Sequence, residues 1–258
     1  MSILPEDPPF GFFDDLMKRV MDHQFFRFGL MKQSATLIIR GLAGVGKTTT
    51  MLGVVEKLQK RDEPVRVASA FFRHNKTDTH DAAKLFIIFI KQLVEQDASF
   101  AMHASSLHVG EDDVSRKLSD ISSVFEKMIE MTARVCIILD GLDEFGNGAK
   151  RTVFMEHVKR IQIKTGVGVI ITERSGGSVG QPWFSDNQHP KIWTIPLKAE
   201  SSDVKNYIEF RLEADKSSWI AEKITQSPNR LQMTSHISNV VTKAATTKEF
   251  SKQISQPM

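Results

Sequence analysis

The chain has 258 residues, 41% hydrophobic and 25% charged, a composition typical of a globular protein with one large core. Its 34 basic and 31 acidic residues give a formal net charge of +3, and since no long run of lysine or arginine occurs, we expect no nucleic-acid partner. The longest apolar run, residues 85–90, is far shorter than the ~20 residues of a spanning helix, and the N-terminus lacks a secretory signal, so we expect a cytoplasmic protein without a membrane partner.

Residues 1–33 are predicted to form a lead-in to the main domain. Three prolines within residues 1–9 predict a loose start. Apolar residues then recur at helical spacing from Phe13 to Met21, which predicts an amphipathic helix within residues 10–32 that packs on the domain.

Beyond the lead-in, apolar strand segments alternate with helical segments. In chain order the predicted segments are a strand at 35–41, a helix at 49–61, a strand at 65–73, helices at 81–96 and 118–132, a strand at 134–141, a helix at 151–164, strands at 167–174 and 191–197, and a helix at 203–212. Strands that are apolar throughout indicate a parallel sheet with helices on both faces, an α/β fold. We expect this core to span residues 34–200, and residues 201–258 to form a partial helical segment with a frayed end.

A phosphate-binding loop follows the first strand. The stretch "GLAGVGKTTT" begins at Gly41 and fills the pattern G-x-x-x-x-G-K-[ST] of a P-loop. Glycines let consecutive N–H groups point at an anion, and the positive end of the next helix adds to the attraction. Lysine supplies a charge to the β- and γ-phosphates, and the hydroxyl of Thr48 is placed to ligate Mg²⁺. The predicted nucleotide-binding residues are Gly41, Gly44, Val45, Gly46, Lys47, Thr48 and Thr49.

An acidic stretch ends the predicted strand at 134–141. In "CIILDGLDEF" the apolar residues deliver Asp140 to the C-terminal end of the strand, where open parallel sheets bind ligands. Asp140 suits a Mg²⁺ ligand, acting through water, and Glu144 or Asp143 would orient and polarise an attacking water. The alternative is a capped loop with solvated acids.

Together these stretches resemble the NACHT class of signalling NTPases, in the wider STAND group of P-loop ATPases. The segments "SAFFRH", "AAKLFIIFIKQL", "VGVIITER" and "IPLKAESSDVKNYIEFRL" look closer to fungal NLR-like receptors and nephrocystin-type N-terminal NACHT domains. The resemblance covers residues 36–212. It implies a P-loop NTPase three-layer sandwich with a five-stranded parallel sheet of order 5-1-4-3-2. It also implies ATP or ADP with Mg²⁺ as cofactors and ATP-dependent switching between resting and oligomeric states.

The resemblance also implies a role for Arg174. In such proteins the strand beyond the acidic one often ends in an arginine that senses the γ-phosphate, and Arg174 matches that place. Family members often read T-S-R-P there, whereas this chain has Thr172, Glu173, Arg174 and Ser175. The alternative is a surface arginine at a strand end.

Two further motif matches are interpreted as accidents. Residues 75–78 spell N-K-x-D, the guanine-reading motif of GTPases, but they follow the second strand, which the implied order puts at the sheet edge, so we favour ATP over GTP. Residues 176–180 spell G-x-S-x-G, but the helix that a hydrolase nucleophile elbow needs does not follow. The histidine spacing and the single cysteine, Cys136, match no zinc pattern.

The sequence therefore supports an ATP-binding signalling switch with slow ATP hydrolysis. The first alternative is a non-catalytic module, or a truncated NLR-like fragment, that keeps nucleotide as a structural ligand and works by self-association or by association with NLR-like relatives. A small-molecule P-loop kinase is a further alternative, although the D-G-L-D-E strand end is not typical of such kinases.

Overall fold

The computed structural model describes residues 14–30, 34–63, 65–73, 81–104, 114–131, 134–145, 148–176 and 191–198. The chain divides into two compact units, Met1–Val204 and Lys205–Met258. All of the described residues belong to the first unit. The predicted helix at 203–212 and the partial helical segment at 201–258 lie outside the described residues.

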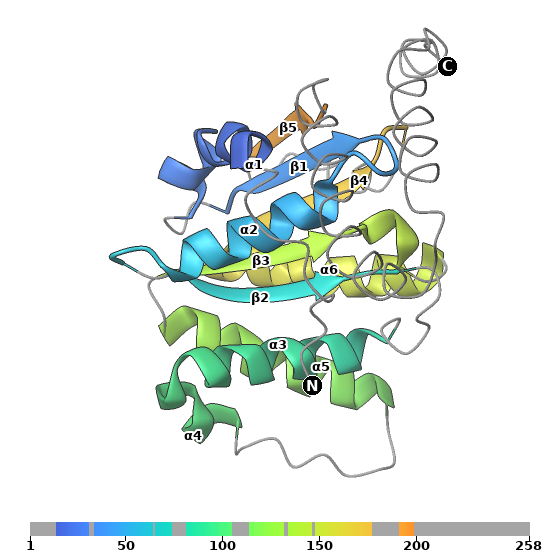
Figure 1. Ribbon diagram of the computed structural model, residues 1–258. Coiled ribbons are helices and arrows are strands. Elements are labelled where there is room, and N and C mark those ends of the chain that lie inside the picture. Colours follow the sequence, from blue (N-terminus) through green and yellow to red (C-terminus); the bar gives the residue numbers. More distant parts are fainter. Residues whose placement is uncertain are drawn as a thin grey trace, which may run out of the picture. The chain divides into compact units, whose positions relative to one another are not determined.

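Five parallel strands form one sheet of order β2-β3-β4-β1-β5 (Figure 1). The strands are β1 (Thr36–Gly41), β2 (Arg66–Phe71), β3 (Val135–Asp140), β4 (Gly168–Arg174) and β5 (Ile192–Pro196). This is the order 5-1-4-3-2 read from the opposite edge, so the predicted P-loop NTPase fold is confirmed. Because β4 separates β1 from β3, the ends of β1, β4 and β3 lie next to one another at the C-terminal edge of the sheet.

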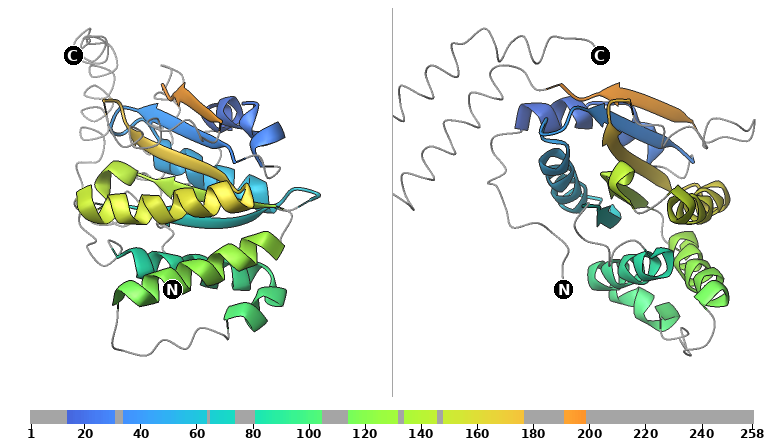
Figure 2. Two further views of the ribbon diagram at one scale, coloured as in Figure 1. Left: turned by 180° about the vertical axis from the view of Figure 1, so that it is seen from behind. Right: turned by 90° about the vertical axis from the view of Figure 1, so that its right-hand side faces the viewer.

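Helices cover both faces of this sheet, as the views in Figure 2 show. The helices are α1 (Asp14–Met21), α2 (Lys47–Gln59), α3 (Ala82–Gln96), α4 (Ala101–Ala104), α5 (Val114–Met131) and α6 (Gly148–Thr165). Buried residues of α1 and α2 pack with one face of the sheet, and those of α3, α5 and α6 with the other. The arrangement is a three-layer sandwich.

The predicted lead-in helix is divided in two. After α1 ends at Met21, a short π-helical turn covers Phe25–Gly29. Phe25 and Phe26, both within this turn, are buried. Phe25 meets the ring of Trp193 in β5 edge-on, with centroids 6.1 Å apart. Both phenylalanines belong to the buried cluster on this face of the sheet.

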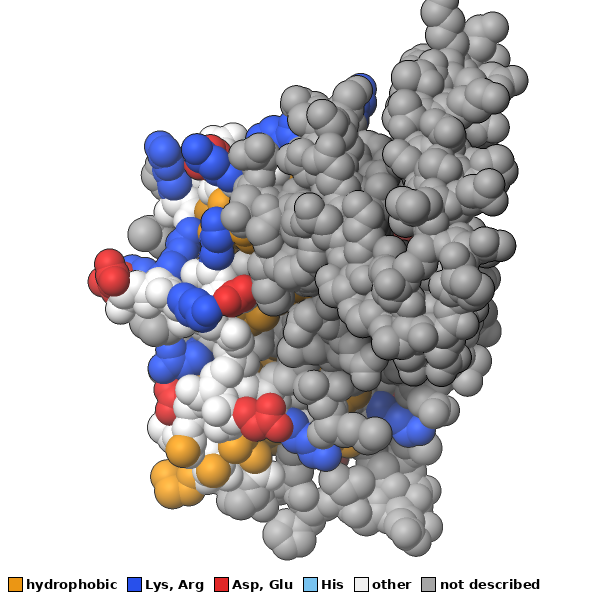
Figure 3. Space-filling view, in the orientation of Figure 1, with side chains coloured by type: hydrophobic (Ala, Val, Ile, Leu, Met, Phe, Trp, Pro, Cys, Tyr) orange, Lys and Arg blue, Asp and Glu red, His pale blue; other side chains and the backbone are white. Residues whose placement is uncertain are grey.

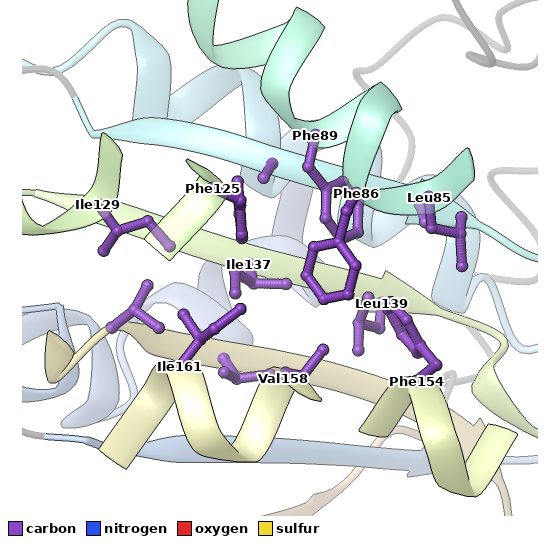
Figure 4. Packing of buried hydrophobic residues seen from close by; sticks show 14 of the residues in the cluster. Leu85, Phe86, Phe89, Phe125, Ile129, Ile137, Leu139, Phe154, Val158 and Ile161 are labelled. Atoms are coloured by element: carbon purple, nitrogen blue, oxygen red, sulfur yellow. The ribbon is translucent and has the colours of Figure 1, made fainter. Parts of the chain in front are cut away.

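Aromatic side chains fill the larger core, between β3 and helices α3, α5 and α6 (Figure 4). The ring of Phe86 lies 5.6 Å from the rings of both Phe125 and Phe154, measured between centroids. The stack continues from Phe154 to Phe145 at 5.4 Å, and Phe145 directly follows the acidic turn. Each buried phenylalanine stabilises the fold by roughly 1.5–3 kcal/mol. The acidic turn is therefore anchored in the main core.

On the other face, α1 packs directly against α2, the helix that follows the phosphate loop. Gly53 of α2 makes this possible, because a Cβ built there would lie 2.4 Å from the Sδ atom of Met17. Leu16, Met17 and Val20 are buried in one cluster with Leu37 and Ile39 of β1. The predicted packing of the lead-in helix on the domain is confirmed.

The free edge of β2 is covered by two glutamines of α3. The amide of Gln96 accepts from Val67 N–H at 2.8 Å and donates to Val67 C=O at 2.7 Å. Gln92 does the same for Ser69, at 2.7 Å and 3.0 Å. Two glutamines one helical turn apart thus stand in for a neighbouring strand, and backbone groups that an edge strand would leave unpaired are satisfied.

The described part of the surface in Figure 3 mixes basic and acidic side chains, with apolar side chains gathered near α4. Met102 of α4 is the most exposed large hydrophobic residue among those described, at 78%.

Among the helices that the structure describes, none is both long and apolar enough to cross a lipid bilayer.

Candidate functional site

The phosphate loop links the end of β1 to the start of α2. Gly44 and Gly46 have φ angles of 77° and 92°, in the left-handed region where side chains are disfavoured. Gly41 is required for a different reason, since a Cβ there would lie 2.8 Å from the carbonyl oxygen of Leu197 after β5. Space above Gly44 is open, because a Cβ built there meets no atom within 4 Å.

Lys47, the first residue of α2, folds back over the loop. Its Nζ donates to the carbonyl oxygens of Gly41 and Leu42, both at 2.8 Å. Burial lowers the pKa of Lys47, while the carboxylates of Asp140, Asp143 and Glu144 act in the opposite direction. The ammonium group thus sits at the loop's own carbonyls, within the field of the acidic turn.

Two threonine hydroxyls hold Asp140, at the end of β3. Thr48 Oγ1 donates to Asp140 Oδ2 at 2.6 Å, and Thr172 Oγ1 of β4 donates to Asp140 Oδ1 at 2.6 Å. Asp140 is almost fully buried, and burial raises the pKa of its carboxyl group, while the two hydroxyls and Lys47 lower it. Burial thus raises the pKa of Asp140 and lowers the pKa of Lys47, and both shifts disfavour the charged form.

The acidic turn follows Asp140 directly. Gly141 has a φ of 71°, and a Cβ there would lie 3.2 Å from the carbonyl oxygen of Phe72, so this bend favours glycine. A single 3₁₀ turn, Leu142–Glu144, then turns its two acids toward the end of β4. Arg174 Nη2 donates to Glu144 Oε1 at 2.5 Å, and Arg174 Nε lies 3.2 Å from Asp143 Oδ2. The strand-end arginine thus binds both acids that could orient water.

A second ion pair lies on the opposite side of the same strand end. Glu173 is fully buried, and Arg40 Nε of β1 donates to its Oε1 at 2.5 Å. In the part of the chain that the structure describes, Glu173 Oε2 has no hydrogen-bond partner. Arg40 and Glu173 are paired in register one step below Gly41 and Arg174. The pair therefore joins β1 and β4 just beneath the loop and the arginine.

The donor set fits a nucleotide phosphate with Mg²⁺. Thr48 Oγ1 and Asp140 Oδ2 are a hydroxyl and a carboxylate oxygen, the hard donors that Mg²⁺ prefers. Among the described residues, no group of three His, Cys, Asp or Glu side chains is placed to hold a metal ion. One or two protein oxygens are the usual protein share when phosphates supply the rest. The glycine loop and Lys47 provide the N–H and ammonium donors that phosphate needs.

The structure brings together every residue that the sequence singles out for the site. The loop residues from Gly41 to Thr49, together with Asp140, Asp143, Glu144 and Arg174, lie at the C-terminal edge of the sheet. Sequence reasoning missed the role of Thr172 and the pairing of Arg40 with Glu173. The available signal was polar residues at the ends of apolar strands, in "LIIRG" and "IITER".

Residues of the two motif matches fall largely outside the described part of the chain. The guanine-like residues 75–78 lie there entirely, as do residues 177–180 of the hydrolase-like stretch. The strand before residues 75–78 is described, however. β2 is an edge strand, separated from β1 by β3 and β4, as the interpretation of that motif requires.

Well over half of the chain matches a known family. Residues 17–174 match the family described as nephrocystin 3, N-terminal. The chain belongs to this family. The matched region of this nephrocystin 3 N-terminal family member runs from α1 to Arg174, so it includes the phosphate loop and the acidic turn. No curated protein matches its sequence.

Solved structures of similar fold include replication initiators. The ORC1 protein of Aeropyrum pernix, in complex with DNA, is 14% identical with a TM-score of 0.48, over 83% of this chain and 52% of that one. Drosophila ORC bound to DNA is 13% identical with a TM-score of 0.48, over 81% and 52%. AMPPCP-bound DnaA from Aquifex aeolicus is 12% identical with a TM-score of 0.43, over 98% and 71%. The family member spans about half the length of the Aeropyrum and Drosophila chains, and at these identities the likeness concerns the fold alone.

One prediction about partners needs correction. The expectation of no nucleic-acid partner is wrong as an exclusion, because the Aeropyrum and Drosophila structures of similar fold are complexes with DNA. A net charge of +3 without a basic run does not exclude such a partner for a fold of this kind.

Proposed function

We propose that this chain is an ATP-binding switch of the NACHT type, within the STAND group, that hydrolyses ATP slowly. The observation that carries the proposal is the 2.6 Å contact between Thr48 Oγ1 and Asp140 Oδ2. It puts the hydroxyl that ends the phosphate loop against the carboxylate that ends β3. In a P-loop NTPase these two groups serve the same metal ion.

Each residue of the site has a role in this proposal. The backbone N–H groups of Gly44, Val45, Gly46, Lys47, Thr48 and Thr49 bind the phosphates, where the start of α2 adds its dipole. Lys47 exchanges its two carbonyl partners for phosphate oxygens. Thr48 and Asp140 hold Mg²⁺, which would supply positive charge to the phosphate oxygens. Because Gly44 and Gly46 keep the loop curled, the donors are arranged before ligand arrives.

Switching would depend on Arg174 and the acidic turn. Arg174 holds Glu144 and Asp143, so Glu144 is engaged by a cation rather than presented to a water. A γ-phosphate that draws Arg174 away would release Glu144 to orient and polarise that water. ADP lacks this phosphate and would leave the pairing intact. Slow hydrolysis of ATP to ADP would therefore return the chain to its resting state, in which Arg174 is paired with Glu144.

ATP rather than GTP is proposed as the nucleotide. The N-K-x-D stretch follows β2, and β2 lies at the sheet edge with β3 and β4 between it and the loop. A base bound beside residues 41–48 would not extend that far. We infer that the base is not read by that motif.

The test is nucleotide binding by two matched variants of the full chain, each compared with the wild type. Lys47→Ala should abolish binding of a fluorescent ATP analogue in the presence of Mg²⁺, because it removes the ammonium at the loop. Lys57→Ala removes an exposed lysine from the last turn of the same helix and should bind as the wild type does. Unchanged affinity in Lys47→Ala would overturn the proposal.

A second candidate function is a non-catalytic module that keeps nucleotide as a structural ligand. The pairing of Glu144 with Arg174 favours it, because an engaged carboxylate cannot orient water. Measured ATP turnover that is lost in Glu144→Gln while binding persists would exclude this candidate. Binding without turnover in the wild type would favour it.

A further inference from the structure

Thr172 occupies the point at which β4 meets both Asp140 and the acidic turn. Its side chain is fully buried. Its hydroxyl accepts the N–H of Gly141 at 2.8 Å and donates to Asp140 Oδ1 at 2.6 Å. A hydroxyl has one proton to donate, and a backbone N–H can only donate. The direction of both bonds is therefore settled, and the proton of Thr172 is committed to Asp140.

This arrangement distinguishes the two oxygens of Asp140. Oδ1 is held by Thr172, and Oδ2 faces Thr48 of the phosphate-loop helix. The terminal torsion of an aspartate is broad, so a carboxylate with one partner can turn its plane. Two partners on opposite oxygens, from β4 and α2, fix the plane. One carboxylate oxygen is therefore kept facing the loop.

The bond to Gly141 extends this control to the acidic turn. Gly141 is the first residue of that turn and starts it with a φ of 71°. Arg174, two residues along β4 from Thr172, binds the other end of the turn through Asp143 and Glu144. Alternate residues of a strand face the same side, so Thr172 and Arg174 act from one face of β4.

We propose that Thr172 is a positioning residue that sets the affinity of the site for Mg²⁺. It acts through Asp140 by keeping Oδ2 directed at Thr48. The inference rests on the proposed function, because it assigns a task within the same nucleotide site. A purely structural Thr172 would join β4 to β3, and its loss would weaken nucleotide binding equally with and without Mg²⁺.

The experiment compares the affinity of the full chain for a fluorescent ADP analogue in Mg²⁺ and in EDTA. Thr172→Val keeps the shape of the side chain and removes the hydroxyl. We expect it to raise the Mg²⁺ concentration needed for half-maximal tightening by about 10- to 100-fold, the usual effect of losing an outer-shell partner. Affinity in EDTA should stay unchanged, and Thr172→Ser, which keeps the hydroxyl, should restore the Mg²⁺ response.

Thr36→Val is the matched control. Thr36 is another fully buried threonine in the neighbouring strand β1, and its hydroxyl contacts the amide of Gln162 at the far end of the sheet. This variant measures the general cost of a lost buried hydroxyl and should leave the Mg²⁺ response unchanged. If Thr172→Val does not fold, Thr172→Cys supplies a similar side chain with a much weaker donor.

A double variant tests whether Thr172 acts through Asp140. Adding Thr172→Val to Asp140→Asn should change the Mg²⁺ response no further, because the carboxylate is already gone. An equal loss of affinity in Mg²⁺ and EDTA, or an unchanged Mg²⁺ response in Thr172→Val, would overturn this inference and leave the proposed function standing. A wild-type chain that binds no nucleotide would overturn both.

Discussion

Arg174 Nη2 lies 2.5 Å from Glu144 Oε1, so the strand-end arginine and the acid that could orient water neutralise each other. The pair joins two elements, β4 and the 3₁₀ turn after β3, whose residues are 30 apart in sequence. Arg174 is about half exposed, which places the pair at the mouth of the site rather than in the core. A ligand phosphate can reach it without unfolding any element.

Arg174→Gln should reduce the preference of the chain for ATP over ADP. A charge-assisted hydrogen bond to a γ-phosphate contributes about 1.5–3 kcal/mol, so we expect ATP affinity to fall about tenfold or more and ADP affinity to stay the same. Parallel titrations with fluorescent ATP and ADP analogues measure this. The thermal midpoint should hardly change, because exposed ion pairs stabilise a fold little. An equal fall for both nucleotides would argue against a γ-phosphate sensor.

Arg40→Met should destabilise the fold, because it leaves Glu173 as a buried, unpaired carboxylate. Breaking a buried pair costs about 3–5 kcal/mol, whereas replacing both members with apolar residues is often neutral. We therefore expect the double variant Arg40→Met with Glu173→Leu to recover most of the stability in urea unfolding. A double variant no more stable than the single one would show that the pair itself, and not the stranded charge, matters.

Replacing Gln92 and Gln96 together with leucine should uncover the edge of β2. Four hydrogen bonds to Val67 and Ser69 are lost, at about 1 kcal/mol each, and an exposed edge strand pairs readily with another chain. We expect lower stability and self-association that grows with concentration, measured by sedimentation. Gln59→Leu is the control, because Gln59 donates to Gln96 and not to the strand.

Stability should fall as the pH drops from about 7 to about 5, in part because of His157. Burial, and next the charge of Arg160, lower the pKa of His157 below 6.5, while Glu156 opposes the shift. The unfolded chain therefore takes up the proton first, so stability is complete above the unfolded pKa and is lost as the pH falls toward the folded one. Ser122 Oγ, 3.0 Å from its Nδ1, and the ring of Phe86 face His157 from α5 and α3.

His157→Gln should flatten this pH dependence, measured as thermal midpoints across the range. Part of the slope should remain, because burial also lowers the pKa of His23. A slope identical to that of the wild type would exclude His157 as its source.

The strands and the main site motifs could be predicted because both depend on local pattern. Every residue of β3 is buried, so the segment reads as a continuous apolar run. The phosphate loop needs glycines at fixed spacing for positive φ at Gly44 and Gly46, and that spacing is visible in the sequence itself. Helix starts were less well predicted: α5 begins at Val114 and α6 at Gly148, earlier than their apolar periodicity indicates.

Contacts between distant segments could not be predicted. Nothing local shows that Thr172 meets Asp140 while Glu173 meets Arg40, since the outcome depends on which face of β4 each side chain takes. The same holds for Gln92 and Gln96, whose backbone partners lie 23 and 29 residues earlier in the sequence. The lead-in likewise ends its α-helix at Met21 and continues as a short π-helical turn over Phe25–Gly29, which its apolar periodicity does not indicate.

The fit of Met17 into the space left by Gly53 makes the lead-in inseparable from the nucleotide site. A chain shortened to start at residue 34 would strip the apolar cover from the back of the very helix whose first residues are Lys47 and Thr48. Such a shortened protein would expose the apolar side chains of α2 to water and would tend to precipitate. Even one added methyl group, as in Gly53→Ala, would force the side chain of Met17 to move.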